Sequence, residues 1–100
     1  MSEKEGQVVL SFQENIVAAN SSDIKQKIRD VITDDLKSLT VDLGSVEQVD
    51  SVGVGILIAG FNSLRKQGKE FKLVNVNKKI FELFQVMRLN KHFPIEVREE

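Results

Sequence analysis

The stretch from Val41 to Gly60 constrains the fold of this chain more than any other segment. Before Gly44, apolar and polar residues alternate, which is typical of a half-buried strand. After a short loop come Asp50 and Ser51, and both residue types are favourable at the N-cap of a helix. The apolar residues that follow are spread widely enough around a helix to indicate that it is buried. They are Val54, Ile56, Leu57, Ile58, Ala59, Phe61 and Leu64. The stretch therefore predicts a strand, a loop and a capped helix.

Strands and helices alternate along the whole chain. Runs rich in Val, Ile, Leu and Phe predict further strands at Gln7–Phe12 and Glu70–Val76, with a short final strand or extended tail at Ile95–Val97. Apolar residues at helical spacing predict helices from Ile24 to Leu36, from about Ser51 to Gln67, and from Lys78 to Arg88. Gly68 is well placed just after the second helix, and Asn77 is favourable as the cap of the third. The third helix is expected to bury an apolar stripe of Ile80, Leu83, Phe84 and Met87. Strands that alternate with helices predict an α/β fold, with helices packed on a mixed, mostly parallel sheet.

Length and composition indicate one compact domain. The chain has 100 residues, of which 41% are hydrophobic, enough for a single core. We expect this domain to span residues 1–100, with residues 1–6 disordered. The net charge is −1 and the charges are mixed, so nucleic acid and anionic membranes are poor partner choices. There is no cysteine, no signal-peptide pattern at the start and no apolar run long enough to span a membrane. These features favour a soluble, cytoplasmic protein.

The predicted start of the second helix has a distinctive chemistry. The first N–H groups of a helix are unpaired within the helix, and an anion beside them is stabilised by about 0.3–1 kcal/mol when exposed. A phosphate group could therefore be carried on Ser51 or bound near it. The alternative is that Asp50 or Ser51 is only a helix cap, and that Gly53 and Gly55 only permit close packing. Local chemistry alone favours this alternative, because caps are far commoner than switches.

The residues do not assemble a recognisable catalytic site. His92 is the only histidine, and Ser51 lacks the Gly-x-Ser-x-Gly pattern of a nucleophilic serine. A dinucleotide-binding loop would need a third glycine where Ile58 stands, and the Gly-Lys-Ser/Thr of a P-loop is missing. We therefore expect no enzymatic activity, no cofactor and no metal. The protein is expected to be acted upon by a partner.

The run from Val49 to Leu57 resembles the signature of the STAS domain found in bacterial anti-sigma factor antagonists. In that family a strand is followed by Asp-Ser-(Ser, Thr or Ala)-Gly-(Leu or Val)-Gly, and a partner kinase phosphorylates the Ser after the Asp. The resemblance covers about residues 8–97 and implies a single STAS-like domain, with Ser51 as the phosphorylation site.

The resemblance also implies a function and partners. The unphosphorylated protein would sequester an ATP-binding anti-sigma factor serine kinase and so release a sigma factor. Phosphorylation of Ser51 would end this binding, and a phosphatase of the PP2C type would reverse the modification.

Candidate partner-binding residues cluster where the predicted strands end. In open α/β sheets the functional surface lies beyond the carboxyl ends of the strands. The start of the second helix lies there, and the loops at residues 16–22 and 75–78 also follow strand ends. The candidates are Asp50, Ser51, Val52, Gly53, Val54, Gly55, Ala18, Asn20, Asn75 and Asn77.

The sequence departs from the family pattern at Val17 and Val52. Many sigma-regulating relatives carry an acid before the first helix, where this chain has Val17, and a small polar residue or alanine where it has Val52. Both changes make the surface more apolar. A second interpretation therefore stays open, in which the chain is an unphosphorylated STAS interaction subunit of another complex, such as a lipid-transport ATPase. A third, a small nucleotide-binding hydrolase, is disfavoured by the missing P-loop.

Overall fold

A computed structural model describes residues 2–98, with the side chains of residues 5–98. The strands are β1 (Ser2–Lys4), β2 (Gln7–Ser11), β3 (Ser38–Asp42), β4 (Glu70–Val76) and β5 (Ile95–Val97). The helices are α1 (Ser21–Val31), α2 (Ser51–Lys66) and α3 (Lys78–Val86), with short 3-10 turns η1 (Ala18–Asn20) and η2 (Leu89–Lys91). Residues 1, 99 and 100, which the predicted domain includes, lie outside the described residues.

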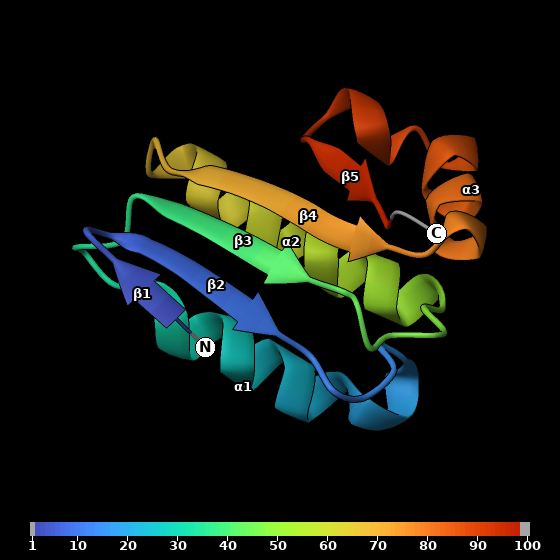
Figure 1. Cartoon of the computed structure of the whole chain (residues 1–100). Coiled ribbons are helices and arrows are strands. Elements are labelled where there is room, and N and C mark those ends of the chain that lie inside the picture. The colour runs from blue at the N-terminus through green and yellow to red at the C-terminus, as the bar shows by residue number, and fades with distance from the viewer. Residues whose placement is uncertain (1, 99–100) are drawn as a thin grey trace.

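The strands form one five-stranded sheet in the order β1-β2-β3-β4-β5 (Figure 1). Strands β2 to β5 are parallel, and β1 pairs antiparallel with β2. The register places Leu10, Val41 and Leu73 side by side on the three central strands. This confirms the predicted α/β fold with a mixed, mostly parallel sheet.

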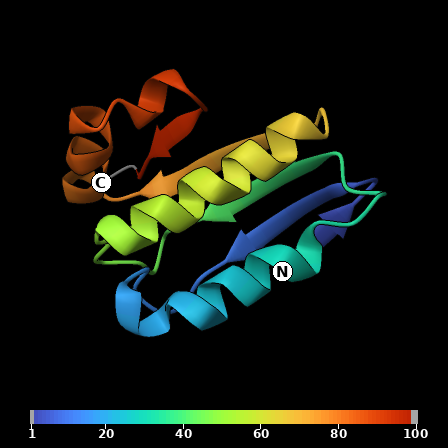
Figure 2. The same ribbon diagram turned by 180° about the vertical axis from the view of Figure 1, so that it is seen from behind.

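Helices α1 and α2 lie side by side on one face of the sheet (Figures 1 and 2). Right-handed crossovers between consecutive neighbouring strands place their helices on the same face, which accounts for this layering. In the described part of the chain no helix covers the opposite face, and α3 lies at the end of the sheet near β5 (Figure 1). Across residues 2–98, none of the helices has the length and apolar character needed to cross a membrane.

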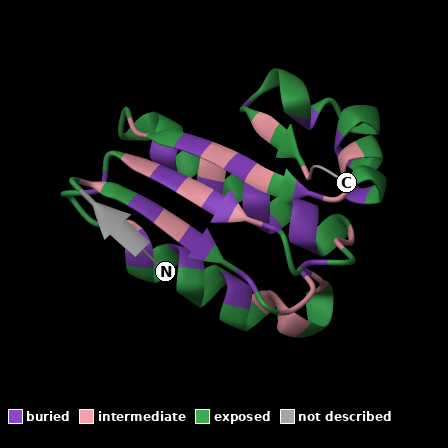
Figure 3. Ribbon diagram, in the orientation of Figure 1, coloured by how far each residue is buried: buried purple, intermediate pink, exposed green. Residues whose placement is uncertain are grey.

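The core lies between the sheet and the helix pair (Figure 3). Along β3, Leu39 and Val41 are fully buried, and the residues between and beside them are partly exposed. Leu57 and Leu64 of α2 are also fully buried in the same cluster. Burying a side chain of this size contributes about 1.5–3 kcal/mol, so α2 is anchored along most of its length.

The predicted helix caps are confirmed at both ends of α2 and at the start of α3. Asp50 is the N-cap of α2, and Asn77 is the N-cap of α3, where its Oδ1 accepts from the Ile80 N–H at 2.7 Å. Gly68 follows α2 with φ +71° and donates its N–H to the Arg65 carbonyl. Glycine adopts this left-handed backbone conformation at little cost in free energy, because it has no Cβ.

The structure differs from the sequence prediction at two places, the N-terminal residues and the end of α1. Residues 1–6 were expected to be disordered, but β1 forms a hairpin with β2 through Glu5 (φ 52°) and Gly6 (φ 84°). Hairpin turns with two positive φ angles normally carry Asn-Gly or Asp-Gly. Here the first of the two turn residues is Glu5, so the sequence did not indicate a hairpin. The first helix ends at Val31 and not at Leu36. Leu36 lies in the loop after the helix, and its side chain is buried in the core.

Candidate functional site

The start of α2 lies at the carboxyl edge of the sheet, close to η1 and on the side of the molecule that α3 occupies (Figure 1). Ser51 is the first residue of the helix and is exposed. Val52, which follows it, keeps 43% of its surface exposed although it is a large apolar residue. The hydroxyl of Ser51 is therefore open to solvent beside an unburied apolar side chain.

Asp50 connects the helix start to the loop before α1. Its Oδ1 accepts a hydrogen bond from the Gly53 N–H at 2.8 Å, and its Oδ2 accepts one from the Ala18 N–H at 2.9 Å. The hydrogen bond from the Ala18 N–H is the largest cause, and the one from the Gly53 N–H the next, of a lowered pKa of the Asp50 carboxyl, below its ordinary value of 3.8. Both bonds stabilise the charged form. The carboxylate is therefore ionised at neutral pH and tied to two segments of the chain.

Gly53 is required by close contact with the same loop. A Cβ on Gly53 would lie 1.9 Å from the carbonyl oxygen of Ile16 and 2.8 Å from its carbonyl carbon. Ile16 is itself fully buried, and its N–H donates to the Gln48 carbonyl at 3.1 Å. The backbone of Ile16 therefore cannot move away freely, and only glycine fits at this point of the helix.

Two asparagines that support this arrangement form a small network. Asn15 accepts hydrogen bonds at Oδ1 from the N–H groups of Glu47 and Gln48, at 3.0 and 3.1 Å. Asn20 donates its side-chain amide to the Asn15 carbonyl at 2.8 Å. Sequence reasoning missed Asn15, because its partners lie more than 30 residues away and no local pattern marks them.

The structure gathers some of the candidate partner-binding residues and separates others. Ala18 is exposed and lies beside Asp50, with Asn20 following it in η1. Gly53 and Val54 are buried, so they shape the surface from beneath. Asn77 donates to the Val46 carbonyl at 3.3 Å and so contacts the loop that leads to Asp50.

Asn75 lies apart from that group. Its backbone has a left-handed φ of 56°, and its side-chain amide donates to both carboxylate oxygens of Asp42 at 3.1 and 3.2 Å. Within residues 5–98 no hydrogen bond joins Asn75 to the turn at Asp50–Gly55. In the same range no group of three histidine, aspartate or glutamate side chains is arranged to hold a metal ion.

The two chain neighbours of Ser51, Asp50 and Val52, line two different apolar hollows. One, of about 370 Å³, lies between the loop at Asp50 and α3, and Val17 and Leu83 line it. The other lies between α1 and α2, and Val52 lines its end. Leu83 was expected in a buried stripe but is 37% exposed, because α3 buries only Ile80 and Phe84.

The sequence of the whole chain, residues 1–100, matches the profile of the STAS domain. A similar protein is the anti-sigma-B factor antagonist of Listeria monocytogenes, 35% identical over 52 residues, which are 52% of this chain and 46% of that protein. The chain spans about half the length of the curated relatives it matches.

Solved structures share the fold. An anti-sigma factor antagonist from Mycobacterium paratuberculosis superposes with a TM-score of 0.83 at 28% identity, covering 95% of this chain and 80% of that one. The murine anion transporter Solute Carrier 26 family member A9 contains the same fold, with a TM-score of 0.82 at 18% identity over 98% of this chain and 17% of that one. The fold therefore occurs in proteins of different function, and function has to be argued from the site.

Proposed function

This chain belongs to the STAS domain family, and we propose that it is an anti-sigma factor antagonist controlled by phosphorylation of Ser51. In its unphosphorylated form it binds an anti-sigma factor that is also an ATP-dependent serine kinase, and the sigma factor held by that kinase is released. Phosphorylation of Ser51 ends the binding, and a PP2C-type phosphatase restores it. The protein itself catalyses no step.

The observation that carries the proposal is the exposed Ser51, whose two chain neighbours, Asp50 and Val52, each line an apolar hollow. Exposed apolar surface around a polar group is typical of a protein-binding site. Val52 and Leu83 line these hollows, with exposed fractions of 43% and 37%. Antagonists of anti-sigma factors are among the relatives that this chain matches in sequence.

Phosphorylation would change the surface while leaving the fold in place. A phosphate adds about −1.5 to −2 charges and three strong acceptor oxygens. The Asp50 carboxylate already accepts from the Gly53 N–H, so a phosphate on Ser51 would remain hydrated and would face a second negative charge. Burying that anion in an interface is unfavourable, and each 1.4 kcal/mol lost lowers the affinity about tenfold.

The test is incubation of the purified chain with ATP and candidate serine kinases of the anti-sigma type from its source organism, followed by mass spectrometry. We expect a mass increase of about 80 Da that maps to Ser51 and disappears in Ser51→Ala. Ser45→Ala is the matched control, because Ser45 is also exposed but lies in the loop before Asp50. A phosphate that maps to Ser45 or Thr40 would contradict the assigned site.

A constitutive STAS interaction subunit is the second candidate. Val17 and Val52 make the surface around Ser51 more apolar than in many sigma-regulating relatives, which favours permanent binding over a switch. In that case the kinase would leave Ser51 unmodified, and Ser51→Asp would weaken the binding of a partner that never phosphorylates it.

A further inference from the structure

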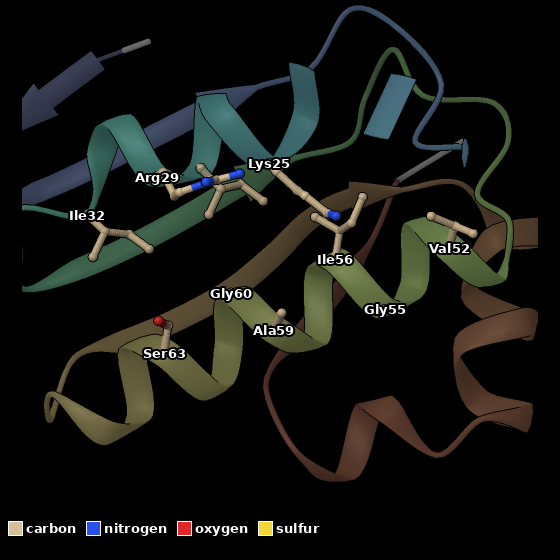
Figure 4. Close-up of a pocket in the computed structure, with 10 residues that line it drawn as sticks. Lys25, Arg29, Ile32, Val52, Gly55, Ile56, Ala59, Gly60 and Ser63 are labelled. Atoms are coloured by element: carbon tan, nitrogen blue, oxygen red, sulfur yellow. The ribbon is translucent and has the colours of Figure 1, made fainter. Parts of the chain in front are cut away.

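A groove of about 500 Å³ runs between α1 and α2, on the outer side of the helix pair (Figure 4). Ile28 of α1 and Ile56 of α2 line it and are both buried, so they form its apolar floor, and Val52 lies at the end nearest Ser51. The groove opens to solvent, so it is a surface feature and not an internal cavity.

The α2 wall of the groove consists of very small residues. Gly55, Ala59 and Ser63 follow one another at intervals of four and are all exposed. A Cβ added at Gly55 would have no other atom within 4 Å, so the space above this wall is empty. Residues four apart share one face of a helix, and three of them extend over roughly 12 Å of its length. Another segment of backbone could therefore approach α2 closely along this strip.

The α1 wall carries positive charge that nothing nearby neutralises. Lys25 and Arg29 are one turn apart and line the groove, and no acidic residue of the described chain lines it. Among residues 5–98, neither side chain has a carboxylate within 4.0 Å. Lys27, on another face of α1, behaves differently and pairs with Glu14 at 2.9 Å. The cations of this helix are thus left unpaired on the side that faces the groove.

We infer that the groove binds an acidic amphipathic helix of the protein partner. Apolar side chains of that helix would cover Ile28 and Ile56, and its carboxylates would pair with Lys25 and Arg29. The small residues of α2 leave room for it, and a helix laid into a groove lined by apolar anchors is a common recognition mode. A second copy of this chain that packed groove against groove would present the same two cations and be repelled.

The groove also offers a physical reason why phosphorylation releases the partner, a point that rests on the proposed function. Val52 lines the groove and directly follows Ser51 in the first turn of α2. A phosphate on Ser51 would add negative charge at that end of the groove. The phosphate would then repel the carboxylates of an acidic helix, and its hydration shell would also prevent close contact at that end of the groove.

The probe is a pair of synthetic amphipathic peptides, each long enough for about four helical turns, with the same leucine stripe. One carries glutamates beside the stripe and the other lysines. Titrated into the ¹⁵N-labelled chain, the glutamate peptide is expected to shift the amide signals of Val52, Gly55 and Ala59 and to bind at least tenfold more tightly than the lysine peptide. Salt of about 1 M should reduce this preference, because it screens charges beyond roughly 3 Å.

Charge reversal at the rim then tests the assignment of the cations. Lys25→Glu combined with Arg29→Glu should invert the preference, so that the lysine peptide binds more tightly. The matched control is Lys78→Glu combined with Lys91→Glu, which changes net charge equally at exposed positions outside the groove and should keep the original preference. Circular dichroism verifies that both double variants are folded.

The inference is overturned if the two peptides bind equally, if neither binds, or if the shifts map to the open face of the sheet. None of these measurements involves a kinase or a phosphate. A chain that binds the glutamate peptide in the groove but never acquires phosphate on Ser51 would retain the docking site and lose the proposed switch. A chain that is phosphorylated on Ser51 but binds neither peptide in the groove would retain the proposed switch and lose the docking site.

Discussion

The inner and outer sides of the first two turns of α2 differ sharply, although they are built from neighbouring residues. On the inner side, Gly53 lies against the backbone of Ile16, and Asp50 is bonded to Ala18. On the outer side, Ser51 is exposed and Gly55 faces empty space. The inner side is thus a packed joint between two segments of the chain, and the outer side is free surface.

This difference shows that the two glycines of the Gly-Val-Gly pattern have separate roles. Residues two apart on a helix point in widely different directions, so they cannot share one neighbour. Gly53 permits the close contact that brings the loop before α1 to the helix. Gly55 makes no such close contact with any described residue. Its missing side chain instead leaves one wall of the α1–α2 groove open.

The largest expected effect is that of Gly53→Ala. The added methyl group would overlap the Ile16 carbonyl oxygen, and both segments are held by other contacts, so the backbone has to shift. We expect the free energy of unfolding to fall by about 3 kcal/mol, at the upper end of the range for overpacked sites. Urea denaturation measures it. A loss below about 1 kcal/mol would mean that the joint is loose.

Asp50→Asn should destabilise the chain less, and in a pH-dependent way. Asparagine keeps the shape of the side chain and can still cap the helix, but it lacks the charge that Ala18 and Gly53 stabilise. The pKa of Asp50 is lowered in the folded chain, so its contribution to stability is present above about pH 3.8 and is lost as the pH falls through the folded-state pKa.

Thermal melts of the parent chain and of Asp50→Asn between about pH 2 and pH 7 test this expectation. The stability difference between the parent chain and Asp50→Asn should shrink as the solution becomes more acidic. A difference that stays constant over this range would show that the charge of Asp50 contributes nothing and that the side chain acts by its shape alone.

Gly55→Ala should have the opposite sign from Gly53→Ala. An exposed glycine inside a helix is less favourable than alanine, and the new methyl group would meet no other atom within 4 Å. We expect a gain in stability of about 0.5–1 kcal/mol. Comparing the two single variants by urea denaturation sharpens the contrast, and equal effects of the same sign would refute it.

Ser51→Ala should have the smallest effect on stability. The helix is capped by Asp50, and the serine side chain is exposed, so its removal should change the free energy of unfolding by less than about 0.5 kcal/mol. A loss above about 1 kcal/mol in the same assay would mean that the hydroxyl is structural. Ser51→Ala is then a clean variant for the phosphorylation experiment, since its fold is unchanged.

Local patterns were sufficient for most of the secondary structure and for part of the site. Alternation before Gly44 and the polar pair at Asp50 and Ser51 predicted β3, the cap and the start of α2. They did not predict that α3 would leave Leu83 and Met87 exposed, because a helical stripe shows which residues share a face but not what covers it. Here α3 packs at the end of the sheet (Figure 1).

The sequence by itself determined the order of strands and helices from Gln7 onward and the caps at Asp50 and Asn77, because each depends on residues close together in the chain. Only the tertiary structure decided that Ile16 excludes a side chain at residue 53, that Asn15 binds the loop before Asp50, and that Lys25 and Arg29 line an open groove. Those features join segments about 30 residues apart. Their geometry is set by the crossover of α1 onto the sheet, and no short pattern encodes it.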